Sequence, residues 1–148
     1  MSTSKPNPKA LEFFKPDFES DVRIPYIDHG VSAGFPSPAL DFMENSIDLN
    51  RSLSDNPTAT FFIKVKGNSM IDAGIDNDDI LVVDRSISPL NKAIAICLID
   101  GEFTVKRLKL EKETLFLMPE NKNYAPIHVT ENNQFEIWGI VTYVIKKI

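Results

Sequence analysis

The chain of 148 residues has only one cysteine, two histidines and a formal net charge of −5. A single cysteine excludes a disulfide framework within the chain, and Cys97 lies in an apolar run, which predicts a buried thiol. The shortage of basic residues argues against broad nucleic-acid binding, which needs a basic face. No apolar run approaches the ~20 residues of a membrane span, and the N-terminus has no signal-peptide core. We therefore expect a cytoplasmic protein that does not enter a membrane.

Motifs for bound groups are missing too. The acidic run at residues 76–79 lacks the glycine and the terminal glutamate of a calcium-binding EF-hand loop. The sequence has neither a glycine-rich phosphate loop nor the Cys/His spacing of a zinc site. It therefore predicts no metal and no cofactor.

The chain divides near residue 57 into a proline-rich part and a β-rich part. Residues 1–36 contain five prolines, which fix φ and remove a hydrogen-bond donor, so we expect an extended and loosely held arm. The Ser37-Pro38 pair predicts the start of a short helix that continues through Phe42. A second short helix is expected over residues 47–53.

From Thr60 onward the pattern is that of β-strands. Runs rich in Val, Ile and Phe alternate with turn residues, and Asp100-Gly101 between two such runs is a strong hairpin signal. Short strands without long helices predict one mainly β domain, built as a compact antiparallel barrel or folded sheet. The predicted strands are Thr60–Lys66, Asp79–Asp84, Lys92–Ile99, Glu102–Leu110, Thr114–Met118 and Phe135–Lys146.

Ser69 and Lys106 are the candidate catalytic pair. A serine hydroxyl is a poor nucleophile until a base takes its proton. A lysine can act as that base only when burial lowers its pKa from about 10.4. Thr104 and Lys106 share one face of a predicted strand, so the threonine hydroxyl can accept a hydrogen bond from the lysine amine. The alternative for Lys106 is an exposed charge on an edge strand.

Ser69 also has an alternative role. Gly67-Asn68-Ser69 can form a turn in which Ser69 or Asn68 caps a short helix over residues 69–73, closed by Gly74. The same position places the hydroxyl beside unsatisfied backbone N–H groups, which favour developing negative charge. A Ser-His-Asp triad would need His29 or His128, and neither has a supporting motif.

The Ala33-Gly34 bond has small residues on both sides. An extended segment of this kind can enter a narrow cleft, with Val31 and Phe35 in shallow pockets, although a flexible loop ahead of a helix fits the same residues. Together with Ser69 and Lys106, this bond suggests a protein that cuts itself.

Six short segments between residues 33 and 127 form an ordered set that is more specific than any one of them. These are 33–39 (AGFPSPA), 47–50 (IDLN), 67–72 (GNSMID), 79–84 (DILVVD), 100–108 (DGEFTVKRL) and 124–127 (YAPI). The ordered set resembles the UmuD family of SOS mutagenesis proteins, which is related to the LexA repressor. The cut site here is Ala-Gly, as in LexA, whereas some UmuD proteins have Cys-Gly.

The resemblance implies a compact LexA/UmuD-type antiparallel β domain with short helices over residues 34–148. It also implies an extended N-terminal arm, residues 1–33, that self-cleavage removes. The activity implied is that of a serine–lysine peptidase. Ser69 would attack the carbonyl carbon of Ala33, and Lys106 would act as general base and then as general acid toward the amine of Gly34. The other implied roles are backbone N–H donors to the oxyanion at Asn68 and Ser69, and a lysine-orienting hydroxyl at Thr104.

Partners are implied by the resemblance as well. In this family RecA on single-stranded DNA stimulates cleavage, and the trimmed product forms a homodimer that joins a UmuC-type Y-family polymerase for translesion synthesis. LexA-type repressors carry a helix-turn-helix domain ahead of the cut, which 33 proline-rich residues cannot form. We therefore expect no direct sequence-specific DNA binding. The alternative function is a non-cleaving module that restrains the polymerase or RecA.

Overall fold

The computed structural model describes residues 11–19, 24–26 and 45–148. The Ala33-Gly34 bond, the helix predicted from Ser37-Pro38 and His29 lie outside them. Among the described residues there is no helix whose length and apolar content would let it cross a membrane.

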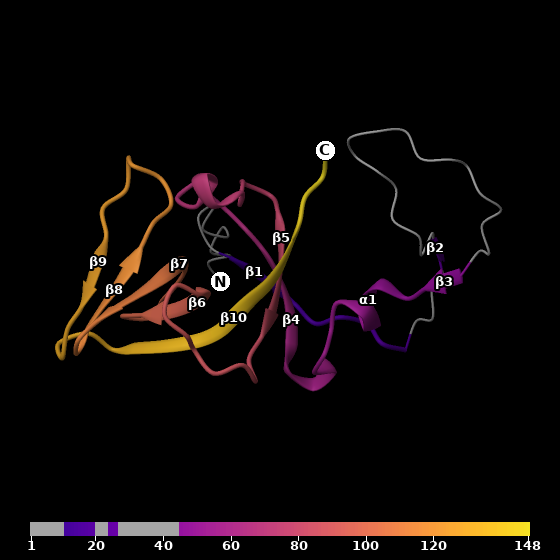
Figure 1. Cartoon of the computed structure of the whole chain (residues 1–148), viewed down its shortest axis with the longest axis horizontal. Coiled ribbons are helices and arrows are strands. Elements are labelled where there is room, and N and C mark those ends of the chain that lie inside the picture. Colours follow the sequence, from indigo (N-terminus) through magenta and orange to yellow (C-terminus); the bar gives the residue numbers. More distant parts are fainter. Residues whose placement is uncertain (1–10, 20–23, 27–44) are drawn as a thin grey trace, which may run out of the picture.

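An eight-stranded sheet forms the body of the protein, in the order β1-β4-β5-β10-β6-β7-β8-β9 (Figure 1). Every neighbouring pair in it is antiparallel, which confirms the predicted mainly β, antiparallel fold. Two further strands, β2 (Ile24–Tyr26) and β3 (Asn45–Ile47), pair with each other. The strands of the large sheet are β1 (Glu12–Phe14), β4 (Thr60–Lys64), β5 (Ile80–Asp84), β6 (Ile94–Ile99), β7 (Glu102–Glu111), β8 (Thr114–Met118), β9 (Ile127–Val129) and β10 (Phe135–Ile145).

Strand β10 joins the two halves of the sheet. Residues 135–140 pair with β6, and residues 140–145 pair with β5. In Figure 1 this strand, in yellow, starts beside the group of strands β6, β7, β8 and β9 and runs toward β4 and β5. Its register shifts between Ile137 and Gly139, where a Cβ on the glycine would lie 2.5 Å from Cγ1 of Val83. The strand can therefore cross β5 closely only because residue 139 has no side chain.

Two apolar clusters fill the interior. The first includes Met70, which is 2% exposed and directly follows Ser69, and the β-strand residues Ile96 and Val105. The second surrounds Cys97, which is fully buried, as the apolar run predicted. The segment that contains Ser69 is therefore anchored in the core by its own sequence neighbour.

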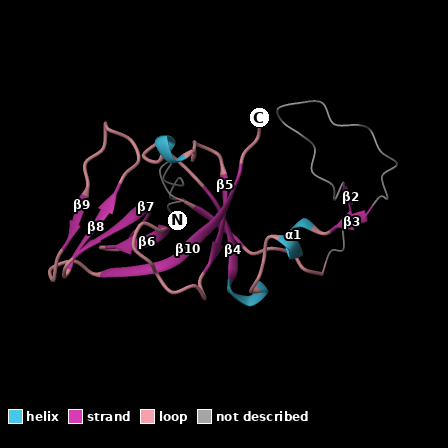
Figure 2. Cartoon of the chain, in the orientation of Figure 1, coloured by secondary structure: helices cyan, strands magenta, loops and turns pink. Residues whose placement is uncertain are grey.

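The helices are short, as Figure 2 shows in cyan. They are α1 (Leu49–Ser52) and the 3₁₀ turns η1 (Pro57–Ala59) and η2 (Ile71–Ala73). The helix predicted over residues 47–53 is confirmed at its centre. It begins after Asp48, whose side chain accepts a hydrogen bond from Asn50 N at 3.1 Å. Ile47 belongs to β3 instead.

The predicted strands after residue 60 are all present, and the Asp100-Gly101 hairpin is confirmed. Its two residues have φ of 49° and 82°, the positive values that a tight primed turn requires. The expectation of a loosely held arm is wrong for residues 11–14, because β1 pairs with β4. Leu11 and Phe13 lie two residues apart on one face of the strand, and both pack against the first cluster.

Candidate active site

Ser69 lies between β4 and η2, in a segment that includes the first two residues of η2 and that we call the nucleophile loop (residues 67–72). The loop opens at Gly67, whose φ of 98° belongs to the left-handed region that favours glycine. The N–H of Gly67 donates to Oδ1 of Asn77 at 2.8 Å, and buried Met70 fixes the other side of Ser69. The backbone is thus held in place on both sides of Ser69.

Ser69 does not cap a helix, so the alternative drawn from the sequence is wrong. The 3₁₀ turn begins only at Ile71, with Met70 at its N-cap and no side-chain capping bond. Its predicted end is confirmed, because Gly74 is left-handed with φ of 79° and its N–H donates to Ile71 O. The hydroxyl of Ser69 is therefore left for another partner.

That partner is Lys106 in the middle of β7. Its Nζ lies 3.0 Å from Oγ of Ser69, 3.0 Å from Oγ1 of Thr104 and 3.0 Å from the carbonyl oxygen of Val105. Thr104 and Lys106 share a face of β7, as the alternation of the strand predicted. The lysine is 6% exposed, so it is not the exposed edge charge that the sequence also allowed.

Burial shifts the pKa of two neighbouring groups in opposite directions. It lowers the pKa of the Lys106 ammonium from 10.5 by removing its hydration, which no carboxylate among the described residues offsets. It raises the pKa of the Cys97 thiol to about 12. The thiol is therefore uncharged near neutral pH and does little to restore the charge on the lysine. The site favours a neutral amine beside a serine hydroxyl.

A second segment, residues 119–124, supports the nucleophile loop, and we call it the support loop. Asn121, which is 7% exposed, donates from Nδ2 to the carbonyl oxygen of Asn68 at 2.9 Å. The Tyr124 hydroxyl donates to Oδ1 of Asn68 at 2.8 Å. Glu120 N donates to Ser69 O at 2.9 Å. Nothing in the sequence marked Glu120 or Asn121, because single hydrogen bonds across such separations leave no periodic pattern.

The support loop is also tied to the strand that carries the lysine. The Arg107 guanidinium forms an ion pair and a hydrogen bond with the carboxylate of Glu120, and Arg107 directly follows Lys106. Glu120 therefore contacts Ser69 through its N–H and the sequence neighbour of Lys106 through its carboxylate. Among the described residues, the backbone N–H groups of Asn68 and Ser69 have no acceptor.

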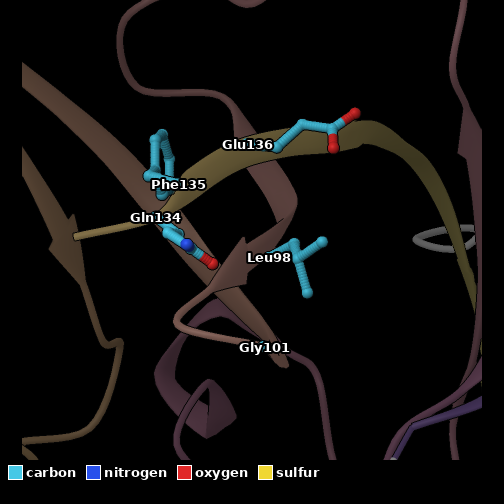
Figure 3. A pocket seen from close by; sticks show the side chains of 5 residues that line it. All are labelled: Leu98, Gly101, Gln134, Phe135 and Glu136. Carbon is cyan, nitrogen blue, oxygen red and sulfur yellow. The ribbon is translucent and has the colours of Figure 1, made fainter.

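Other candidate positions lie elsewhere. His128 is on β9, where its ring stacks on Phe116 at 4.8 Å between centroids, and it makes no contact with Ser69. The described part of the chain has no group of three or more His, Cys, Asp or Glu side chains that could hold a metal ion. A cavity of about 230 Å³ opens beside the β6–β7 hairpin (Figure 3), but it does not include Ser69 or Lys106. Its lining is Leu98, Gly101, Gln134, Phe135 and Glu136.

Comparison with known proteins agrees with this geometry. Residues 25–142 match the family described as Peptidase S24-like. The chain is 41% identical to Protein MucA of Salmonella typhimurium over 121 residues, which cover 81% of this chain and 82% of MucA. It is 43% identical to Protein ImpA of Salmonella typhimurium over 133 residues, 87% of each chain.

A more distant kind of relative is the LexA repressor of Caldicellulosiruptor saccharolyticus. It is 38% identical over 144 residues, which cover 95% of this chain and 69% of the repressor. The UmuD-type resemblance seen in the sequence is confirmed, and the chain belongs to the Peptidase S24-like family.

Proposed function

We propose that this protein is a serine–lysine peptidase that cuts its own chain between Ala33 and Gly34. The observation that carries the proposal is the 3.0 Å contact between Nζ of Lys106 and Oγ of Ser69 at a lysine that is 6% exposed. Burial beside a serine disfavours the charged ammonium form of the lysine. A lysine with a pKa shifted in this way is a candidate for a general base. Membership of a peptidase family supports the same chemistry.

The neutral lysine is oriented by its two other contacts. A neutral amine has two N–H groups and one lone pair. The Thr104 hydroxyl and the Val105 carbonyl accept the two N–H groups, so the lone pair points at the hydroxyl of Ser69. Lys106 then removes the hydroxyl proton as Oγ attacks the carbonyl carbon of Ala33.

The reaction is completed by returning that proton. The Lys106 ammonium protonates the amine of Gly34 as the peptide bond breaks, which leaves residues up to Ala33 as an ester on Ser69. The neutral Lys106 amine next takes a proton from water, and the resulting hydroxide attacks the ester. Lys106 then returns that proton to Oγ as the bond between Oγ and the Ala33 carbonyl carbon breaks. The products are a free carboxylate on Ala33 and a restored Ser69 hydroxyl.

The negative charge that develops on the Ala33 carbonyl oxygen needs donors. The backbone N–H groups of Asn68 and Ser69 are available for this, since no acceptor in the described chain uses them. The support loop holds Asn68 at both its carbonyl and its side chain, so these donors need little reorganisation during the reaction.

The cellular role that we propose follows from the family resemblance. RecA assembled on single-stranded DNA stimulates the cut in the cytoplasm, and residues 34–148 then act as a homodimeric accessory subunit of a UmuC-type Y-family polymerase. The tethered arm explains why the activity is directed at the chain itself, because a linked substrate has a high effective concentration.

The test is the intact mass of the full chain after incubation at alkaline pH, and separately with RecA, ATP and single-stranded DNA. We expect two fragments that meet between Ala33 and Gly34, and none from a Ser69→Ala chain. A wild-type chain that stays whole in both conditions, while still folded, would contradict the proposal. That result, together with binding to the polymerase or RecA, would favour the non-cleaving module instead.

A further inference from the structure

Residues 11–19 lie against the β domain, although all of them precede the proposed cut. Strand β1 forms one end of the eight-stranded sheet and pairs with β4 alone. The register places Glu12 opposite Lys64, and Phe13 opposite Ile63. The arm therefore covers the backbone edge of β4, which would be the open edge of the sheet without it.

An aromatic cluster receives the side chain of Phe13. We define this cluster as Phe61, Phe103 and Trp138. The Phe13 ring centroid lies 4.7 Å from that of Phe103 and 5.0 Å from that of Trp138, in tilted and edge-on orientations. Phe14, on the other face of β1, is 49% exposed. The contact is therefore specific for one of two adjacent phenylalanines.

A third set of contacts holds the arm beyond β1. From α1, Asn50 Nδ2 donates to the carbonyl oxygen of Asp17 at 2.9 Å, and the Arg51 guanidinium donates to that of Phe18 at 3.1 Å. Both bonds go to backbone oxygens, at the bend that follows β1, so they do not depend on the side chains of Asp17 and Phe18. Every partner of the arm in these three sets lies after residue 34.

We infer that the β4 edge, the aromatic cluster and α1 form a strand-acceptor site for an extended segment of a partner protein. The intact chain fills this site with its own residues 11–19, which show what the site accepts. Backbone pairing along β4 supplies affinity for an extended segment, and the α1 bonds hold the bend that follows it. The aromatic cluster selects an aromatic side chain at the place of Phe13. Lys64, opposite Glu12, favours an acidic residue just before the aromatic one.

Cleavage would make this site accessible to a partner segment. A cut after Ala33 would turn residues 11–19 from a tethered strand into a separate peptide that a competing segment can displace. That exchange rests on the function proposed above, whereas the acceptor site itself does not. The arm strand is only three residues long, which makes displacement by a longer or more apolar segment favourable.

The test uses full-length chains that carry Ser69→Ala, so that no outcome depends on cleavage. The probe is a fluorescent peptide of residues 11–19 with capped ends, and its binding is followed by anisotropy. We expect the Ser69→Ala/Phe13→Ala chain to bind the peptide at least about tenfold more tightly than the Ser69→Ala chain, whose own arm occupies the site. The Phe14→Ala chain is the matched control and should behave as its parent. A peptide with Phe13→Ala should lose at least about tenfold in affinity.

Three results would overturn the inference. The first is that the peptide binds equally to the Ser69→Ala chain and to a chain whose arm is also changed. The second is that the Phe13 and Phe14 changes have equal effects. The third is that the peptide binds to no chain with a changed arm. A chain with Glu12→Lys places two like charges opposite each other at Lys64 and so loosens the arm without changing α1, the aromatic cluster or the core, and the test stands even if Phe13→Ala misfolds. If the peptide instead converts a Ser69→Ala dimer into monomers in sedimentation, a second copy is the occupant and the assignment to a partner segment is wrong.

Discussion

The nucleophile loop and the arm segment 11–19 both lie against the β domain, but they are held in different ways. The nucleophile loop has a buried anchor in Met70 and hydrogen bonds from the support loop, which is itself tied to β7. The arm has a three-residue strand, the partly buried Phe13 and two bonds from surface side chains of α1. The comparison indicates a candidate active site that is fixed in advance and an arm that fewer contacts hold in place.

The largest effect should come from removing the base. Lys106→Met keeps an apolar stem in a buried position but cannot take a proton, so self-cleavage should fall by about 10³-fold or more. The rate of fragment formation, followed by mass spectrometry, measures this. Lys109→Ala on the same strand is the control, since its side chain is 48% exposed and it should cleave normally. Normal cleavage by Lys106→Met would remove the lysine from the mechanism.

The next effect is the pH dependence of the rate. Burial lowers the pKa of Lys106, and only the neutral amine accepts a proton, so the rate should rise up to about tenfold per pH unit and then level off below pH 10.5. Cleavage rates from neutral to alkaline pH measure the profile. A plateau that appears only above pH 10.5 would contradict a lowered pKa.

The same shift has a consequence for stability with a definite sign. Between the lowered pKa of the folded protein and 10.5, the unfolded chain binds a proton at Lys106 that the folded chain does not bind. The free energy of unfolding, relative to Lys106→Met, should therefore rise with pH in that window, by at most about 1.4 kcal/mol per unit. Denaturant unfolding of both chains, carrying Ser69→Ala, measures the difference. A difference that falls with pH would contradict a lowered pKa.

Tyr124→Phe, which affects the nucleophile loop, should have a smaller effect on the cleavage rate. It removes only the hydroxyl that holds Asn68, so cleavage should slow by about three- to tenfold, equivalent to the ~1 kcal/mol of one hydrogen bond. The midpoint of the pH profile should not move, because the tyrosine orients the loop and does not exchange protons with the serine. Tyr143→Phe is a matched control, since Tyr143 is 46% exposed and Tyr124 is 45% exposed. Equal rates for wild type and Tyr124→Phe would show that the support loop is not needed to hold the site.

Local sequence patterns were enough to predict most of the sheet. The strands after residue 60 follow from dense β-branched and aromatic runs, and Asp100-Gly101 fixes one hairpin through two positive φ angles. Strand β1 was missed because three residues among prolines give a weak signal, and its partner β4 lies far along the chain. The alternation of Leu11 and Phe13 is the signal that could have indicated a buried face there.

Local sequence patterns were also insufficient to predict the contacts in the candidate active site. Ser69 and Lys106 are 37 positions apart, and no rule of local spacing predicts a 3.0 Å contact between them, so the family resemblance was needed to pair them. The adjacency of Thr104 to Lys106 did follow from strand alternation. Asn121 and Tyr124 reach Asn68 from more than 50 positions away through single hydrogen bonds. The catalytic roles of all these residues stay predictions until cleavage is measured.

The smallest expected effect concerns the arm segment 11–19. Lys15 Nζ lies 5.6 Å above the Phe61 ring at an exposed position, a contact worth about 0.5–1 kcal/mol. Lys15→Gln should lower the opening free energy of β1 by no more than that amount, as measured by hydrogen exchange of its amides in the Ser69→Ala background. Lys109→Gln is the control, because Lys109 Nζ lies 6.0 Å from the Phe116 ring on strands far from the arm. If Lys15→Gln also sped exchange in β7, the arm would be part of the cooperative core, and the contrast between a fixed site and an arm held by fewer contacts would fail.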